Sequence, residues 1–234
     1  MIELQAVTKR YGSLTAVDNV SLSVKQGEYF ALLGPNGAGK TTIVKMLLDL
    51  TRPTSGTLMV NGLSSSNASC RIAVGYLAEN YRIPPHLSGW QHLLCCTELL
   101  GLRPPDAVDQ CKKIVELIGM QGREHTKVGT YSRGMIQRFG LGSALLGNPK
   151  LLILDEPTSG LDPIGIREIR QLLESLKHQG MTILLNSHLL SEVEKICDTA
   201  AIINRGKLLM KDSISSIVRN GETLEDVFVR LVKG

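Results

Sequence analysis

Residues 34–41 constrain the fold of this chain more than any other segment. Their sequence, GPNGAGKT, fits the pattern G-x-x-x-x-G-K-[ST] of a phosphate-binding loop. The apolar run Tyr29–Leu33 before the loop is typical of a buried parallel strand, and residues 42–50 after it have helical character. A strand, a glycine-rich turn and a helix in this order predict an α/β fold with an anionic ligand at the turn.

The residue types of this loop suit a polyphosphate. Gly34, Gly37 and Gly39 let backbone N–H groups close around phosphate oxygens, and the N-terminus of the following helix adds positive potential. We expect Lys40 to reach the β- and γ-phosphates and the Thr41 hydroxyl to hold Mg²⁺. A purely structural glycine turn is the alternative interpretation.

A second strand end, within residues 151–162, disfavours that alternative. The sequence LLILDEPTSGLD runs from an apolar strand at residues 151–154 into Asp155 and Glu156. Parallel sheets bind ligands at the carboxyl ends of their strands, where two adjacent charges are costly unless a cation, water or substrate uses them. An ordinary exposed acidic loop is the competing interpretation, and the phosphate-loop pattern upstream disfavours it.

The composition fits one large folded domain, or a domain that carries an inserted subdomain. A hydrophobic content of 43% and a charged content of 21% over 234 residues exclude a disordered chain. The net charge of +4 suits a nucleotide or an anionic surface but identifies neither. No apolar run approaches a membrane span, and the N-terminus has no secretory character, so we expect a cytoplasmic protein. Its five cysteines form no C-x-x-C pair, which favours reduced thiols over a metal site.

Periodicity predicts an antiparallel β part, a helical insertion and a βα core. Alternating apolar positions over residues 2–30, and a strand at 57–60 before the turn Asn61-Gly62, predict antiparallel strands. No strand pattern occurs from residue 84 to 129, where helices are expected. The apolar stripe of the last helix is expected to pack on the core rather than dock a partner. The other expected elements are strands at 71–77, 181–186, 200–203 and 207–210 and helices at 90–100, 107–118, 163–178, 190–196 and 224–231.

Four motifs in one order give the chain a specific resemblance to the nucleotide-binding subunits of ABC transporters. GPNGAGKTT at 34–42 resembles their phosphate loop, YSRGM at 131–135 their signature sequence, LLILDEPTSGLD at 151–162 their Walker B strand and D-loop, and NSHLLSEVE at 186–194 their switch-histidine region. The resemblance implies a P-loop NTPase core with a mostly parallel sheet, an N-terminal antiparallel β subdomain and an inserted α-helical subdomain. It implies a single domain over residues 1–234. Residues 1–80 and 148–234 then form the ATP-binding core, and about 81–147 the helical subdomain with the signature helix.

The resemblance also implies ATP and Mg²⁺ as ligands and assigns catalytic roles to Lys40, Glu156 and His188. Glu156 would orient and deprotonate the water that attacks the γ-phosphate, or else be a second metal ligand or a mere neighbour. His188 would contact the γ-phosphate and hold that water, whereas a lone histidine is more often a core residue. Asp155 would bind the Mg²⁺ shell with Thr41. The residues implied to bind ATP are Tyr11, Gly34, Pro35, Asn36, Gly37, Ala38, Gly39, Lys40, Thr41 and Thr42.

Two of these assignments carry open alternatives. Tyr11 falls where the family has an aromatic residue that stacks on adenine, and an exposed edge tyrosine without a ligand is the competing interpretation. Glu79, in GYLAEN, falls where most of the family has a glutamine that senses Mg²⁺ and γ-phosphate. A glutamate there retains an oxygen for metal or water, but it adds a charge and loses the amide donor.

In the family the signature sequence serves the ATP of a second, antiparallel subunit. It opens a helix whose N-terminus points at the partner's γ-phosphate. The usual form is LSGGQ, and this chain has YSRGM. The arginine either adds charge toward the phosphate or is solvated, and the sequence leaves both open. The residues implied to act in trans are Ser132, Arg133, Gly134 and Asp162.

The implied function is an ATPase that drives a transporter. Two copies, or one copy and a homologue, would close around two ATP·Mg²⁺ and open after hydrolysis. Transmembrane permease subunits would complete the assembly, dock near residues 80–105 and hold the chain on the cytoplasmic face of the membrane. The resemblance of YSRGM, SHLLSEVE and LEDVF to bacterial exporters of drugs, antibiotics, lipids or polysaccharides favours export over import.

The alternative function is a soluble ABC ATPase that remodels nucleic acid or ribosomes. Such relatives usually carry two ATPase domains, long coiled coils or basic insertions, and this sequence has one domain, no heptad run and no basic cluster. We therefore expect no nucleic-acid partner. A P-loop kinase conflicts with the signature sequence and the D-loop.

Overall fold

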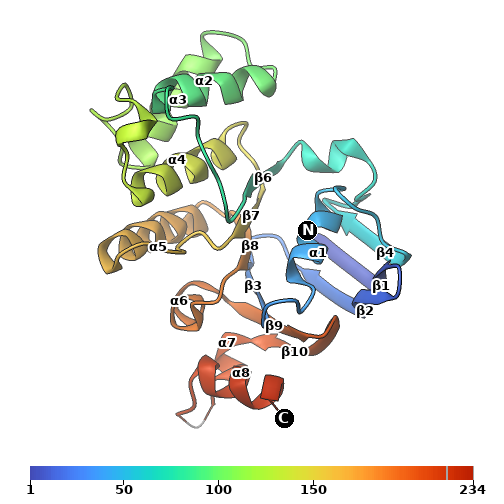
Figure 1. Cartoon of the computed structure of the whole chain (residues 1–234). Helices are drawn as coiled ribbons and strands as arrows, with labels where there is room; N and C mark the ends of the chain where they lie inside the picture. The colour runs from blue at the N-terminus through green and yellow to red at the C-terminus, as the bar shows by residue number, and fades with distance from the viewer. Residues whose placement is uncertain (220, 234) are drawn as a thin grey trace. The chain divides into compact units, whose positions relative to one another are not determined.

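The computed structural model describes residues 1–219 and 221–233 (Figure 1). The chain divides into two compact units. The first unit comprises Met1–Ile72 and Lys177–Gly234, and the second comprises Ala73–Leu176.

An antiparallel sheet begins the first unit, as the alternating pattern predicts. Its strand order is β2-β1-β4-β5. The turn between β4 and β5 has φ of 53° at Asn61 and 76° at Gly62, which suits the tight hairpin turn expected there. The strands are β1 (Ile2–Tyr11), β2 (Leu14–Val24), β4 (Ser55–Val60) and β5 (Leu63–Ser64).

A mostly parallel set of strands forms the core of the first unit. Strand β3 (Tyr29–Leu33) pairs in parallel with β8 (Thr182–Asn186) and with β9 (Thr199–Asn204), and β9 pairs antiparallel with β10 (Lys207–Ser213). All residues of β3 and β8 are buried, which explains why both read as unbroken apolar runs. The helices of this unit are α1 (Lys40–Leu47), α6 (Leu190–Ile196), α7 (Ile214–Ile217) and α8 (Leu224–Lys233).

The last helix packs on the protein, as its apolar stripe predicts. Leu224 and Val227 of α8 are buried, and the helix contacts α6 and α7. The prediction of a core-facing stripe is therefore confirmed within the described part of this helix.

The second unit combines two strands with a group of helices. Strands β6 (Val74–Leu77) and β7 (Leu151–Asp155) pair in parallel. Gly75 of β6 lies against α4, where an added Cβ would collide with the carbonyl oxygen of Ala144. Helices α2, α3 and α4 contact one another and form the helical insertion predicted from the sequence (Figure 1). The helices are α2 (Gly89–Leu99), α3 (Asp106–Leu117), α4 (Arg133–Leu145) and α5 (Pro163–His178), whose last two residues belong to the first unit.

The end of α1 and the start of β6 differ from the predicted bounds because of local turns. Helix α1 ends at Leu47 rather than near residue 50, since Asp49 adopts φ of 56° and Leu50 N–H returns to the carbonyl of Lys45 at 2.9 Å. Strand β6 begins at Val74 rather than residue 71, because Ala68–Arg71 form a 3₁₀ turn. A second 3₁₀ turn, Val128–Thr130, was not predicted.

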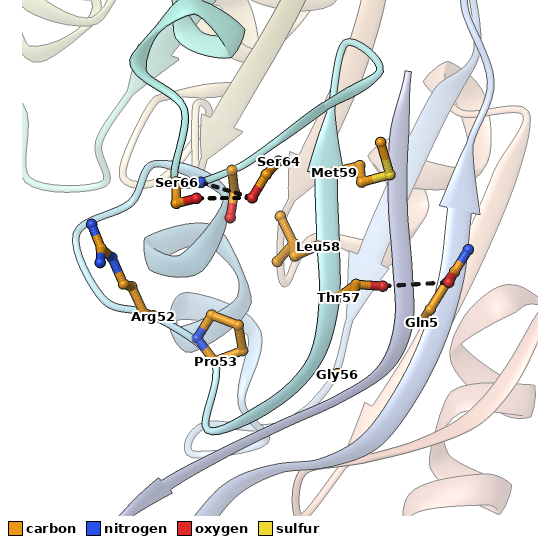
Figure 2. Close-up of a pocket in the computed structure, with 10 residues that line it drawn as sticks. Gln5, Arg52, Pro53, Gly56, Thr57, Leu58, Met59, Ser64 and Ser66 are labelled. Carbon is orange, nitrogen blue, oxygen red and sulfur yellow. Dashed lines mark hydrogen bonds between the residues drawn. The ribbon is translucent and has the colours of Figure 1, made fainter.

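A hollow of about 560 Å³ lies beside β4 and takes no part in the predicted nucleotide site (Figure 2). Its polar side chains pair within the first unit. Thr57 Oγ1 donates to Gln5 Oε1 at 3.3 Å, and the Ser64 and Ser66 hydroxyls lie 2.9 Å apart. Since these groups already have partners, we assign the hollow no ligand.

Candidate nucleotide-binding site

The predicted phosphate loop lies between β3 and α1, and close backbone packing accounts for two of its glycines. An added Cβ would collide with the carbonyl oxygen of Ile203 at Gly34 and with that of Ala16 at Gly39, whose φ is 109°. Gly37 has φ of 79° and no atom within 4 Å of an added Cβ. Residues 34 and 39 therefore need glycine for packing, while Gly37 leaves the open side of the loop clear.

The start of α1 and the Lys40 ammonium form a positive cradle. No side chain caps the first turn of α1, which contains no acidic residue. Lys40 Nζ donates to the carbonyl oxygens of Gly34 at 2.7 Å and Pro35 at 3.2 Å, so the ammonium lies over the loop. Uncapped N–H groups at a helix N-terminus attract anions. The residues present therefore fit the phosphates of ATP.

His188 lies at the same sheet edge as this loop. It follows the carboxyl end of β8, and its side chain is exposed. Leu32 of β3 pairs with Asn186 of β8 in a parallel ladder, so the loop after β3 and the residues after β8 emerge side by side. The structure thus brings His188 to the edge that carries the phosphate loop.

Tyr11, the last residue of β1, is 45% exposed. The Lys9 ammonium lies 4.9 Å from its ring centroid. Its hydroxyl lies 3.5 Å from Thr51 Oγ1. The ring remains accessible to solvent in the unit that holds the phosphate loop.

The acidic residues predicted for the site gather at one edge of the second unit. Leu77 pairs with Leu154 in the parallel ladder, so Glu79 and the carboxylates after residue 154 leave the same end of β6 and β7. The pKa of Tyr76 is raised by burial and further by the negative charges of Asp155 and Glu79. Both carboxylates therefore lie within electrostatic reach of one phenol.

Asp155 and Glu156 are held in different ways. Asp155 is only 5% exposed, and burial of a carboxylate is costly unless it is paired or binds a cation. Mg²⁺ takes oxygen ligands, and the Thr41 hydroxyl and the Asp155 carboxylate supply such oxygens.

Glu156 has φ of 52°, a left-handed conformation that costs a non-glycine residue roughly 1–3 kcal/mol. Such strain concentrates at functional sites, and no pattern in the sequence predicts it at this residue.

A separate hollow of about 350 Å³ gathers the residues predicted to act in trans. Ser132 begins α4 as its N-cap, and its Oγ accepts from Met135 N–H at 3.3 Å. Asp162 caps α5 in the same way, accepting from Gly165 N–H at 2.8 Å. The lining includes Ser132, Arg133, Gly134, Gly160 and Asp162.

Arg133 uses the space left by a glycine. At Gly160, whose φ is 67°, an added Cβ would collide with the guanidinium of Arg133. The arginine side chain is exposed and packs on the backbone of the D-loop segment. Its charge therefore lies in the hollow that also holds Ser132 and Gly134.

Tyr131, which stands where the usual signature has leucine, has a structural role that the sequence did not indicate. Its ring stacks on Phe139 with centroids 5.3 Å apart and an interplanar angle of 18°. Its hydroxyl donates to the carbonyl of Arg123 at 2.7 Å and accepts from Gly89 N–H at 3.3 Å. The aromatic residue therefore joins the segment before α4 to α2 and to the loop after α3.

In the described part of the chain, no helix is long and apolar enough to cross a membrane.

Comparison with known proteins places these features in one family. The family model described as "ABC transporter" matches residues 17–159. The chain is 42% identical over 212 residues to two curated relatives, and each alignment covers 89% of this chain and 68% of the relative. They are the uncharacterized ABC transporter ATP-binding protein YhcH of Bacillus subtilis and the bacitracin transport ATP-binding protein BcrA of Bacillus licheniformis. It is 38% identical over 228 residues to the lantibiotic transport ATP-binding protein SrtF of Streptococcus pyogenes, covering 97% of this chain and 96% of that protein.

A solved structure of an ATP-binding subunit of an ABC transporter has the same fold. Its TM-score is 0.88 at 28% identity, with 99% of each chain covered. The family model spans more than half of this chain. The chain therefore belongs to the ABC transporter family, as an ATP-binding subunit that hydrolyses ATP and powers transport.

Proposed function

We propose that the chain powers an exporter by closing, with a second ATP-binding subunit, around two ATP·Mg²⁺. The observation that carries this proposal is the hollow at the starts of α4 and α5, which gathers Ser132, Arg133, Gly134 and Asp162. The start of α4 and the Arg133 guanidinium there suit a phosphate, whereas the start of α5 is already capped by the Asp162 carboxylate. The chain has its own phosphate loop at the start of α1, so this second anion site has a use when a partner presents its ATP.

The proposed reaction is attack of water on the γ-phosphorus. The bond from that phosphorus to the β,γ-bridging oxygen breaks, giving ADP and phosphate. Glu156 accepts a proton from the water, and His188 holds the γ-phosphate and the water in line. Mg²⁺, for which Thr41, Asp155 and Glu79 are the proposed protein ligands, supplies charge neutralisation on the phosphate oxygens.

The phosphate loop and the partner's signature residues supply the rest of the proposed site. Lys40 and the N–H groups at the start of α1 hold the β- and γ-phosphates, while Tyr11 supports the adenine. From the partner, the Ser132 hydroxyl and the N–H groups of residues 133 and 134 approach the γ-phosphate. Arg133 adds a positive charge there, so we propose that it acts on phosphate rather than being merely solvated.

Export as the proposed direction of transport is supported by the resemblance of YSRGM, SHLLSEVE and LEDVF to bacterial exporters, and the proposed class of cargo by the named relatives. Proteins for bacitracin and lantibiotic transport are 38–42% identical to this chain. We propose a cargo of that class, selected by transmembrane permease subunits that hold the chain at the cytoplasmic face of the membrane. These comparisons do not favour remodelling of nucleic acid or ribosomes.

Substitution of Glu156 tests the proposed chemistry. Glu156→Gln keeps the size and shape of the side chain but replaces one carboxylate oxygen by an NH₂ donor and so removes the base. We expect turnover to fall at least about 100-fold, in the range typical of a lost general base. ATP binding should persist, and an ATP-bound dimer should accumulate on size-exclusion chromatography. Normal turnover by this variant would exclude Glu156 as the base.

A further inference from the structure

A half-buried polar cluster in the second unit joins the segment after β6 to two helices. The Tyr81 hydroxyl lies 2.5 Å from His92 Nε2, and Ser143 Oγ lies 3.1 Å from the same nitrogen. Tyr81 follows β6, His92 lies on α2 and Ser143 lies on α4, the helix that begins at the signature sequence. We call these three residues the Tyr81 cluster.

The Tyr81 ring packs on the surface of α4 at Gly140. At Gly140 of α4, an added Cβ would lie 2.7 Å from Tyr81 Cδ1 and 2.8 Å from Leu77 Cδ1. The Tyr81 and His92 rings meet edge to face with centroids 5.9 Å apart. Absence of a side chain at residue 140 is therefore what lets the Tyr81 ring reach the surface of α4.

The cluster is uncharged near neutral pH. Burial raises the pKa of Tyr81 to about 12 and lowers the pKa of His92. With its proton on Nε2, the neutral imidazole shares one N–H between the Tyr81 hydroxyl oxygen and Ser143 Oγ, which both accept it. Ser143 Oγ also donates to the carbonyl of Phe139 at 2.9 Å, which fixes it on α4.

Tyr81 closes the backbone turn that contains Glu79. The backbone N–H of Tyr81 donates to the carbonyl of Ala78 at 3.2 Å, closing a turn that contains Glu79. Glu79 itself is exposed at the carboxyl edge of β6 and β7. Anything that fixes Tyr81 therefore fixes the turn that presents Glu79.

We propose that Tyr81 and His92 are positioning residues that hold the Glu79 turn on α4, so that Glu79 and the signature helix move together. This inference rests on the proposed function, in which Glu79 acts at the chain's own nucleotide and Ser132 at the partner's. The Glu79 turn and Ser132 then adjust as one body, because a helix transmits the position of Ser143 to its N-cap. Loss of the cluster leaves Glu79 and Ser132 in place as side chains, but their positions no longer change together.

Hydroxyl deletions test this proposal in the full-length chain. Tyr81→Phe keeps the ring on Gly140 and removes only the hydroxyl, and Ser143→Ala removes the hydroxyl of α4 that contacts His92 and leaves the Cys96 Sγ contact at 3.6 Å in place. We expect each to lower kcat for ATP about three- to tenfold, the effect of one misplaced hydrogen bond, with KM changed less than twofold. Combining them should add little. His92→Gln, which retains an N–H donor, should lose less activity than His92→Leu.

The Glu79→Ala background separates positioning from general damage. Glu79→Ala alone should lower kcat. If Tyr81 acts through Glu79, Tyr81→Phe should cause no further loss in that background. Hydrogen exchange of the nucleotide-free chain should show faster exchange at residues 79–83 in Tyr81→Phe. The matched control is Ser175→Ala, because Ser175 Oγ makes the same in-helix bond, to the carbonyl of Leu172 at 2.7 Å, outside the cluster.

Three results would overturn the proposal. The first is an unchanged kcat in Tyr81→Phe, and the second is an equal loss of kcat with and without Glu79. The third is a Glu79→Ala variant with normal kcat, which would also remove Glu79 from the proposed site. The first two leave the proposed function standing, so failure of this inference can be distinguished from failure of the site.

Discussion

Removal of the Tyr131 hydroxyl should destabilise the second unit measurably. Tyr131→Phe keeps the stack on Phe139 but leaves the buried N–H of Gly89 without its hydrogen-bond partner. The carbonyl of Arg123 also loses the tyrosine hydroxyl, but it still accepts from the N–H and the Oγ1 of Thr126. An orphaned buried polar group costs about 1–3 kcal/mol. In a chain of this size we expect Tm to fall by roughly 2–10 °C.

Tyr131→Leu, which restores the residue usual in the family, should be worse rather than better. It loses the same hydrogen bonds and also the ring stack, which adds about 0.5–1.5 kcal/mol. The stability order should therefore be wild type, then Tyr131→Phe, then Tyr131→Leu.

Urea unfolding of the nucleotide-free chain measures this order. Trp90 is the sole tryptophan of the chain and lies on α2 of the same unit, so its fluorescence reports the relevant transition. We expect a lower midpoint with an unchanged m-value. A Tyr131→Phe variant within about 0.3 kcal/mol of wild type, or a Tyr131→Leu variant more stable than wild type, would refute the structural role of the hydroxyl.

Other expected outcomes follow from burial and backbone geometry. Gly34→Ala should abolish ATP binding or folding, because its Cβ collides with the carbonyl oxygen of Ile203, whereas Gly37→Ala should lower the free energy of unfolding by only about 1–2 kcal/mol for its positive φ. Fluorescent-nucleotide titration and thermal unfolding compare the two variants, and equal effects would contradict the assigned packing. A thiol reagent at pH 8 should modify the exposed Cys95 first, because burial raises the pKa of the thiols of Cys96, Cys197 and Cys111, that of Cys111 to about 11. Mass spectrometry of the native chain measures the order of labelling, and early labelling of Cys197 would contradict this prediction. Burial lowers the pKa of His92, so the unfolded chain binds the proton more readily and the free energy of unfolding should fall as the pH drops through about 6.5. Urea unfolding at pH 7 and pH 5.5 should show a smaller fall in His92→Gln than in wild type. An equal fall in both proteins would argue against burial of the imidazole.

Much of the fold follows from periodicity and glycine placement. The apolar runs of β3, β7 and β8 predict buried strands, and the bounds of α5 and α6 agree with the predicted ones because amphipathic spacing and flanking polar residues mark their ends. The short 3₁₀ turns and α7 were not predicted, since they contain too few residues for a periodic pattern.

The residues of the candidate site are visible in the sequence, but their supports are not. The phosphate-loop pattern identifies Lys40 without any structure. The left-handed backbone of Glu156, the Tyr131 stack and the Tyr81 cluster depend on contacts between residues far apart in the chain, and a single sequence carries no signal of such contacts. What the structure adds is therefore the second layer of residues that hold the predicted ones.

Complementation between two inactive variants tests the composite site most directly. Lys40→Ala removes the phosphate-loop ammonium, and Gly134→Asp places a carboxylate where the signature should meet a partner's phosphate. Each variant alone should be inactive. In an equimolar mixture half of the dimers are mixed, and one of their two sites pairs an intact loop with an intact signature. We therefore expect the mixture to recover roughly a quarter of wild-type ATPase activity. A mixture no more active than its components, with Gly134→Asp still binding ATP, would contradict it.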